Sequence, residues 1–211
     1  MEKYLKTGIF AAIITIAALN ISCKKDEPSN TSDKFSFDGH DYKVVKSLKT
    51  WADAAKDAVA QGGYLVEIGS QAEQDAVYKG IKDAGVSATY TTVNDGGGAA
   101  YVWIGGTDRE LENFWQWNGA NVSGINKMFW FGDNKGAAYG GAYANWGGKS
   151  AGKFNEPDNF TDPDVSPNGQ DAAAIGLANW PTGSSSPLGV AGEWNDLNEN
   201  NKLYYVIEIG E

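Results

Sequence analysis

Apolar and polar residues alternate along residues 35–45, around an Asp-Gly pair at Asp38-Gly39. Alternation with a period of two is typical of β-strands, and Asp-Gly between two such runs favours a tight hairpin turn. The stretch is therefore predicted to form a β-hairpin. A second apolar run, Leu203 to Ile209, is predicted to be the last strand. We expect it to pair with the hairpin and bring the ends of the domain together.

The spacing of apolar residues changes to that of a helix after the hairpin. Positions i, i+3, i+4, i+7 and i+8 are apolar between Trp51 and Val59, which makes one apolar face. Thr50 precedes this face, and Asp53 completes a capping box. The sequence therefore predicts a helix that begins after Thr50 and ends at the Gly62-Gly63 pair.

A strand and a second helix are predicted next. Residues 64–68 are mostly apolar and read as a strand. Ser70 is a helix-capping residue with Glu73 three positions later, and Gly85 is a suitable stop signal. The expected order in this half of the chain is therefore hairpin, helix, strand, helix.

The middle of the chain combines a buried strand with a long loop region. Ala100 to Gly106 is almost entirely apolar and predicts a core strand, followed by another strand and turn at residues 114–119. From Ala120 to Lys153, Gly, Asn and Ala alternate with aromatic residues, which is typical of loops. These aromatic side chains either pack the loops together or contact a ligand, and the sequence leaves both interpretations open.

The first residues are typical of a secretory signal. A short basic segment precedes an apolar run from Gly8 to Leu19, and this run is too short to favour a membrane-spanning helix. Cys23 follows where bacterial lipoprotein signals place the acylated cysteine. We expect residues 1–22 to be a lipoprotein signal peptide, with lipidation at Cys23. Residues 23–34 are expected to form a flexible tether, and residues 35–211 to form one domain.

Composition narrows the classes of function. The formal charge of −10 argues against nucleic-acid binding, because no basic patch is present to meet phosphates. Cys23 is the only cysteine, so the chain has no internal disulfide. His40, the only histidine, lies beside the predicted turn, so a Ser-His-Asp or Cys-His arrangement finds no base. The chain is therefore not expected to be an enzyme.

Oxygen donors gather in two segments near the end of the chain. Carboxylates occur at Glu156, Asp158 and Asp196, and amide oxygens at Asn195 and Asn159. Calcium takes six to eight such ligands, so the two segments could meet around one ion. A cis bond before Pro157 would direct the two carboxylates beside it to the same side. The alternative is that both segments are ordinary polar turns.

The two segments resemble the calcium- and sugar-binding site of C-type lectin-like domains, which carry a Glu-Pro-Asn or Gln-Pro-Asp triplet and then a Trp-Asn-Asp triplet. The corresponding residues are Glu156-Pro157-Asp158 and Trp194-Asn195-Asp196. The helix, Gly-Gly, strand, helix order and the Trp103-Ile104-Gly105 run also resemble this family. The resemblance implies an α+β fold with two helices, two small antiparallel sheets, a long loop region and adjacent termini.

The resemblance also implies site residues and calcium as the cofactor. The expected metal ligands are Glu156, Asp158, Gln170, Asn195 and Asp196. The residues expected to contact a bound ligand are Glu156, Asp158, Asn195, Trp146 and Phe160. Asp158 replaces the family's Asn and Gln170 replaces its Glu, so the donor pattern assigns neither a mannose-type nor a galactose-type preference.

The positions of the family's disulfides give a check on the register. The long disulfide would join Ala58 to Ile207, and the second would join Glu199 to Ala172. An apolar Ala and Ile pair is a sensible replacement for a disulfide in a core.

Three functional hypotheses follow, of which the first is preferred. The first is a lipoprotein of the outer membrane, exposed on the cell surface, that binds a glycan or polysaccharide through calcium. The second is an adhesin whose aromatic loop, residues 120–153, contacts a host or cell-surface protein, with calcium structural or absent. The third is a glycosidase that uses paired carboxylates, although Glu156 and Asp158 are better explained by calcium.

Overall fold

The computed structural model describes Met1, residues 32–124 and residues 126–210. Residues 2–31 lie outside this part of the chain. They include nearly all of the expected signal peptide, Cys23 and most of the expected tether. The described helices are α1 (Trp51–Ala60) and α2 (Gln71–Asp83), with two short 3-10 turns, η1 (Tyr139–Gly141) and η2 (Lys149–Ala151). The described strands are β1 (Lys34–Phe37), β2 (His40–Lys49), β3 (Tyr64–Leu65), β4 (Tyr101–Thr107), β5 (Phe114–Trp117), β6 (Lys127–Phe131), β7 (Ala137–Ala138), β8 (Ala172–Gly176), β9 (Trp194–Leu197) and β10 (Leu203–Ile209).

The strands confirm the expected α+β class, with one amendment to the expected sheets. The main order is β1-β2-β10-β4-β5-β6-β7, while β3 pairs with β10 and β8 pairs with both β4 and β9. All pairs between these strands are antiparallel except β10 with β4, which is parallel. That parallel pair joins the two expected sheets into one hydrogen-bonded network, because β10 pairs with β2 along one edge and, through Tyr204 and Tyr205, with β4 along the other.

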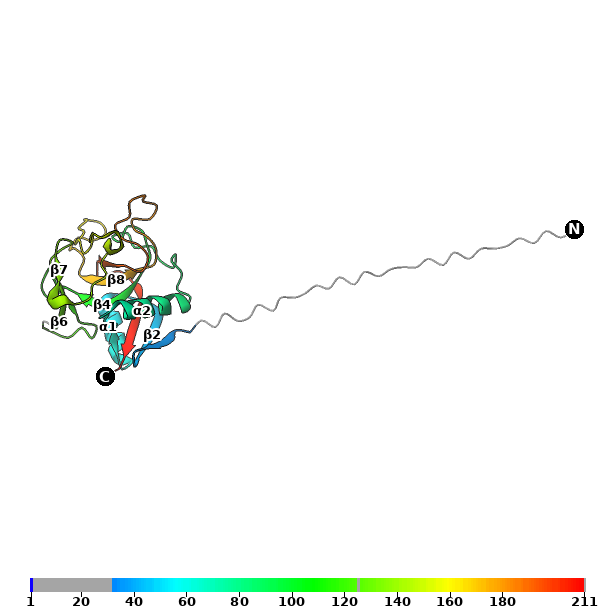
Figure 1. Ribbon diagram of the computed structural model, residues 1–211, viewed down its shortest axis with the longest axis horizontal. Coiled ribbons are helices and arrows are strands. Elements are labelled where there is room, and N and C mark those ends of the chain that lie inside the picture. Colours follow the sequence, from blue (N-terminus) through cyan, green and yellow to red (C-terminus); the bar gives the residue numbers. More distant parts are fainter. Residues whose placement is uncertain (2–31, 125, 211) are drawn as a thin grey trace. The chain divides into compact units, whose positions relative to one another are not determined.

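The N-terminal hairpin forms as the Asp-Gly signal predicts. Asp38 and Gly39 have φ of 48° and 86°, the positive values that a tight hairpin turn requires. Strand β2 then lies between β1 and β10, because Lys43 pairs with Lys34 on one side and with Ile207 on the other. The first and last strands of the domain are therefore close together (Figure 1), as expected.

Both helices begin at the predicted caps. The Thr50 hydroxyl accepts a hydrogen bond from the Asp53 N–H at 3.2 Å, and the Ser70 hydroxyl accepts one from Glu73 N–H at 3.1 Å. These bonds satisfy N–H groups that the first turn of a helix leaves without partners. One detail differs, because Val59, expected on the apolar face, is 50% exposed. Val59, at position i+8 from Trp51, lies beyond the part of the helix surface that the sheet covers.

The two glycines after α1 have different roles. Gly62 has φ of 83°, a left-handed conformation that glycine adopts without steric cost. Gly63 allows close packing, since a Cβ there would lie 2.2 Å from the Glu208 carbonyl oxygen of β10. The pair therefore ends the helix and turns the chain directly onto the last strand.

The helices cover opposite faces of the central strands. Alternate side chains of a strand point to opposite faces, so the cluster that each one joins identifies its face. Tyr101 and Trp103 of β4 join a cluster with α1, whereas Val102 and Ile104 join a cluster with α2. Every residue of β4 is buried for this reason.

The register expected from the disulfide positions is compatible with the core. Ala58 and Ile207 are both fully buried in the cluster beneath α1. The second pair of positions is used differently. Glu199 forms an ion pair with Arg109 at 3.1 Å, and Ala172 is buried in β8 opposite Leu197. Neither α1 nor α2 is long and apolar enough to cross a membrane.

Candidate functional site

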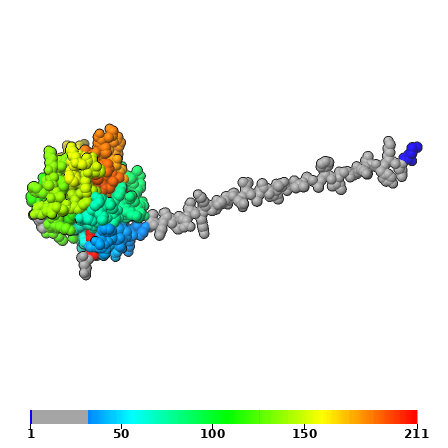
Figure 2. Space-filling model, viewed as in Figure 1, coloured from blue at the N-terminus to red at the C-terminus, as the bar shows by residue number. Residues whose placement is uncertain are grey.

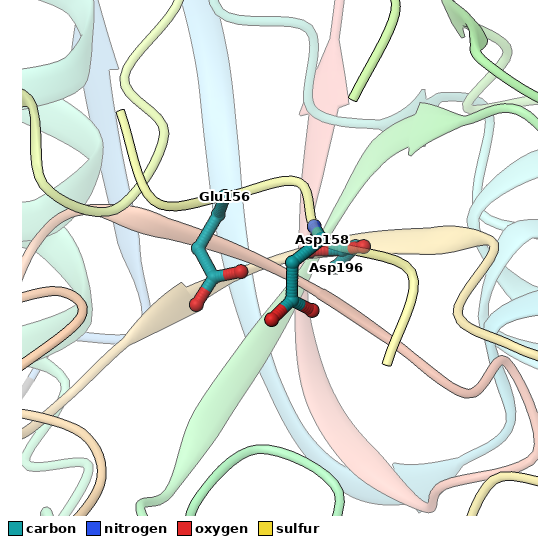
Figure 3. Close-up of side chains that lie close together, drawn as sticks. All are labelled: Glu156, Asp158 and Asp196. Carbon is teal, nitrogen blue, oxygen red and sulfur yellow. Dashed lines mark hydrogen bonds between the residues drawn. The ribbon is translucent and has the colours of Figure 1, made fainter. Parts of the chain in front are cut away.

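Glu156, Asp158 and Asp196 lie close together, although Asp196 is on β9 and the other two are on the loop between η2 and β8. One carboxylate oxygen from each lies within 4.8 Å of the others. Figure 3 shows the side chains of Glu156 and Asp158 extending to the same side of their loop, with Asp196 beside Asp158. The Glu156-Pro157 bond is cis, as the sequence suggested. We call these three residues the acidic triad.

Asp196 ties the loop to the sheet. Its carboxylate accepts hydrogen bonds from the backbone N–H groups of Asp158 at 3.2 Å and Asn159 at 2.8 Å. Asn159 has a positive φ of 48°, a conformation that Asn tolerates better than most residues. Its side-chain oxygen accepts from the Gln170 N–H at 2.7 Å. The triad is thus held by a network that joins the loop, the segment just before β8, and β9.

Glu156 is buried with one oxygen free. The side chain is 2% exposed, and its Oε1 accepts a hydrogen bond from the indole N–H of Trp180 at 2.9 Å. Its Oε2 is also buried and has no hydrogen-bond partner among the described residues. Buried carboxylate oxygens are rarely left in this state, because the lost hydration costs free energy. A cation is the kind of group that this oxygen lacks.

Burial and mutual repulsion disfavour the charged forms of the triad. Burial, and then the charges of Asp196 and Asp158, raise the pKa of Glu156 well above its ordinary value. Burial and the Asp158 carboxylate raise the pKa of Asp196 to about 8. Burial also raises the pKa of Asp158. Three carboxylates this close are stabilised together by a divalent cation, which replaces repulsion by attraction.

The two amides expected as ligands are also at the site. The Asn195 amide donates to the Tyr101 hydroxyl at 3.1 Å, which leaves its oxygen for a cation. The Gln170 oxygen accepts from Phe160 N–H at 2.8 Å, and its amide nitrogen donates to the Asp95 carbonyl at 3.0 Å. Gln170 therefore holds two loops together in addition to any part in binding a metal. The oxygen donors fit calcium, which prefers carboxylate and amide ligands.

The aromatic residues of the long loop divide into packed and exposed ones, and one expectation is corrected. Trp146, expected to contact ligand, is fully buried against Trp115, Phe129 and Trp194. Trp130 is buried too, and its indole packs edge-on against Phe154. The reason is that strands β5, β6 and β9 close over these indoles, which the local sequence does not reveal. Phe129, Trp130 and Trp146 therefore belong to the core.

Phe160 lies beside the carboxylates of the candidate site. It is 43% exposed and lines a cavity together with Glu156, Asp158, Gln170 and Asn195. The loop around residue 160 and the segment near residue 185 lie side by side on one face of the domain, in yellow and orange (Figure 2).

Sequence reasoning missed the residues that support the site. Trp180 positions Glu156, and Tyr101 positions Asn195. Asp95 accepts the backbone N–H of Asn198 at 2.8 Å, just beyond β9. One sequence feature could have revealed Trp180. It stands with Pro181 as a bulky pair in a stretch otherwise rich in Gly and Ser. Such a residue in a polar loop indicates an anchoring contact.

Residues 47–208 match the family model for the Lectin C-type domain, which spans most of the chain, so the protein belongs to the C-type lectin domain family. Among curated proteins, it is 36% identical over 104 residues to one chain of the Snaclec coagulation factor IX-binding protein of Protobothrops flavoviridis, covering 46% of this chain and 70% of that one. It is 30% identical over 122 residues to Snaclec 5 of Echis pyramidum leakeyi, covering 56% and 70%.

Solved structures show the same fold. The carbohydrate-recognition domain of the mouse scavenger receptor C-type lectin has a TM-score of 0.51 and 22% identity, covering 83% of this chain and 93% of that one. Human lithostathine has a TM-score of 0.52 and 19% identity, covering 85% and 98%. At these identities the likeness shows the fold alone. The expected C-type lectin-like fold is therefore confirmed.

Proposed function

We propose that this protein binds carbohydrate through a calcium ion held by Glu156, Asp158, Asn195 and Asp196, with Gln170 beside them. The observation that carries the proposal is the free, buried Oε2 of Glu156 within a triad of carboxylates. A site built for hydrogen bonding alone would supply a donor to that oxygen. The triad therefore serves to bind an ion and, through it, a sugar.

The residues around the ion suit sugar hydroxyls. Calcium supplies positive charge that attracts hydroxyl oxygens. The carboxylates of Glu156 and Asp158 accept hydrogen bonds from the hydroxyl hydrogens. The Asn195 amide has two hydrogens, and Tyr101 takes one, so the other can be donated to a sugar oxygen. Donor and acceptors together would fix the orientation of one sugar.

The test is a glycan array probed with calcium and with chelator. We expect retention only with calcium. Asn195→Asp keeps an oxygen for the ion and removes the donor, so it should abolish sugar retention and keep calcium-dependent melting. Asn200→Asp, which adds the same charge at an exposed position, is the matched control. Retention that survives chelator, or full retention by Asn195→Asp, would refute this mechanism.

We further propose that the domain is displayed on the cell surface by a lipid on Cys23, as an outer-membrane lipoprotein. The support is the sequence pattern of residues 1–22 and the small polar tether that follows. A Cys23→Ser variant should leave the membrane fraction, and one that remains there would contradict the anchor.

A second function, binding of a protein partner, has its own support. Phe131 and Tyr139, in the long loop region, are 51% and 56% exposed. Exposed aromatic side chains are common anchors of protein interfaces. A relative is also named for binding coagulation factor IX. If no glycan is retained while Tyr139→Ala abolishes binding to cells, this adhesin function replaces the first.

A further inference from the structure

Two members of the acidic triad, Glu156 and Asp158, line a cavity of about 230 Å³. Three segments form its wall: the Gly-rich stretch 94–97, residues 156–160, and residues 180–188 of the connection between β8 and β9. Glu156 and Asp158, whose carboxylates extend to the same side in Figure 3, line it together with Asn195. The candidate ion site is therefore enclosed by neighbouring loops.

The wall formed by the β8–β9 connection is fixed in place by hydrogen bonds. The chain doubles back so that Leu188 N–H donates to the Trp180 carbonyl at 2.7 Å. Thr182 N–H donates to the Gly97 carbonyl at 2.8 Å, which ties the wall to the Gly-rich stretch. The Asn155 amide donates to the Leu188 carbonyl at 2.8 Å, which ties it to the long loop. The cavity is thus largely preformed.

The chemistry of this wall contrasts with that of the triad. Phe160 and Leu188 line the cavity and are 43% and 38% exposed, and Pro181 lines it between them along the chain. Large apolar side chains that gather around a concave site with a few polar groups mark a place where a ligand binds. The ligand must therefore present hydroxyls to one side and an apolar group to the other.

The size of the cavity limits the ligand. Pockets for drug-sized molecules begin at about 300 Å³, so this cavity suits a single sugar ring. A cavity of this volume has little room for a chain that continues past the ring. The end of a glycan fits this shape better than a sugar in the middle of one.

We propose that the site selects a terminal sugar whose ring carries a methyl group in place of a hydroxymethyl group, a 6-deoxy sugar. Phe160, Pro181 and Leu188 are the specificity-determining residues. A methyl group against this wall leaves water and gains apolar contact. A hydroxymethyl group there would place a hydroxyl among side chains that offer it no hydrogen bond. The inference rests on the proposed calcium-dependent sugar binding and names its substrate class.

Two matched pairs of sugars test it. Methyl L-fucoside and methyl L-galactoside differ only in the methyl and hydroxymethyl groups, as do the glycosides of L-rhamnose and L-mannose. Competition against a retained glycan in calcium should show a preference of about tenfold or more for the 6-deoxy member of at least one pair, the range that hydrophobic pockets achieve for so small a difference. Glycans in which a further sugar extends the 6-deoxy residue should lose binding.

Variants of the wall locate the preference. Leu188→Ala and Phe160→Ala should each reduce the ratio between pair members toward one while calcium-dependent melting persists. Leu111→Ala removes an exposed apolar side chain that does not line this cavity, so the ratio should be unchanged. Melting in calcium and chelator reports the ion site separately from sugar choice.

The possible results distinguish the 6-deoxy preference from the proposed calcium-dependent sugar binding. Calcium-dependent retention with equal affinity for both members of each pair would overturn the 6-deoxy preference and leave the proposed function standing. Equal binding of terminal and extended sugars would overturn the chain-end geometry in the same way. Absence of sugar binding in calcium, with or without a calcium effect on melting, would overturn both.

Discussion

Two buried glutamates lie in the loop-rich half of this domain, and they differ in the number of hydrogen-bond donors around their carboxylates. Glu193, just before β9, is 5% exposed and accepts backbone N–H bonds from Ser150 at 2.7 Å, Gly148 at 2.9 Å and Val190 at 3.0 Å. Glu156 is 2% exposed, accepts one bond from Trp180, and leaves Oε2 without a partner in the described part of the chain.

The difference shows how burial alone fails to report the role of a carboxylate. Around Glu193, three backbone donors replace the lost water, so the carboxylate holds three loop positions together. Around Glu156, two further carboxylates stand where donors would be needed. The first region is complete within the protein. The second leaves one buried oxygen without a donor, and the calcium ion that we propose would complete it.

The largest expected effect is at Glu193. Glu193→Ala leaves three N–H groups without their acceptor, and the Gly148 bond among them is buried. Buried donors cost about 1–3 kcal/mol each when unpaired, so we expect the free energy of unfolding to fall by about 3 kcal/mol. Urea unfolding should show the loss in chelator as well as in calcium. A loss confined to calcium would mean that Glu193 also serves the ion site.

Glu156→Gln should have an effect that depends on calcium. In chelator the substitution removes one of three repelling charges, so the free energy of unfolding should be unchanged or higher. In calcium the parent protein should gain about 2.7 kcal/mol at a concentration one hundred times its Kd, and the variant should not. Melting with titrated calcium measures both. Glu110→Gln, at an exposed position, is the control. If calcium stabilises both variants equally, the ion does not bind at Glu156.

A further effect is the pH dependence of the triad in chelator. Asp196 has a pKa of about 8 in the folded protein and an ordinary value of 3.8 unfolded, so the folded state holds its proton more tightly. This stability is fully present below about pH 4 and is lost as pH rises through about 8. Unfolding at pH 5 and pH 8, compared with Asp196→Asn, isolates the contribution.

Calcium should change the sign of that dependence, because the ion competes with protons for the same carboxylates. Stability in calcium should therefore rise between pH 5 and pH 8 relative to chelator. If the parent protein in chelator gains stability over this range relative to Asp196→Asn, the raised pKa is wrong and the triad does not repel.

Local signals accounted for the beginnings and ends of the elements. The Asp38-Gly39 turn and the caps at Thr50 and Ser70 were predicted correctly, because each depends on a hydrogen bond or a φ value within a few residues. Strand β10 was predicted with its observed bounds for a similar reason, since an apolar run between polar residues marks its own limits.

Burial was predicted less well where it depends on distant segments. Val59 is exposed and Trp146 is buried, contrary to the helical face and the loop contact expected of them. An apolar residue is covered only if another element reaches it. For Trp146 those elements are β5, β6 and β9, whose approach no local pattern encodes.

The sequence alone determined the chemistry of the candidate site: carboxylates at Glu156 and Asp158, and the Asn195-Asp196 pair, in an order that resembles the C-type lectin site. Only the tertiary structure decided which oxygen remains free and what surrounds it. Trp180 donates a hydrogen bond to one oxygen of Glu156 and leaves the other without a donor, while Leu188 lines the cavity. The physical reason is that side-chain type fixes which bonds a group can make, whereas the path of distant loops fixes which bonds it does make.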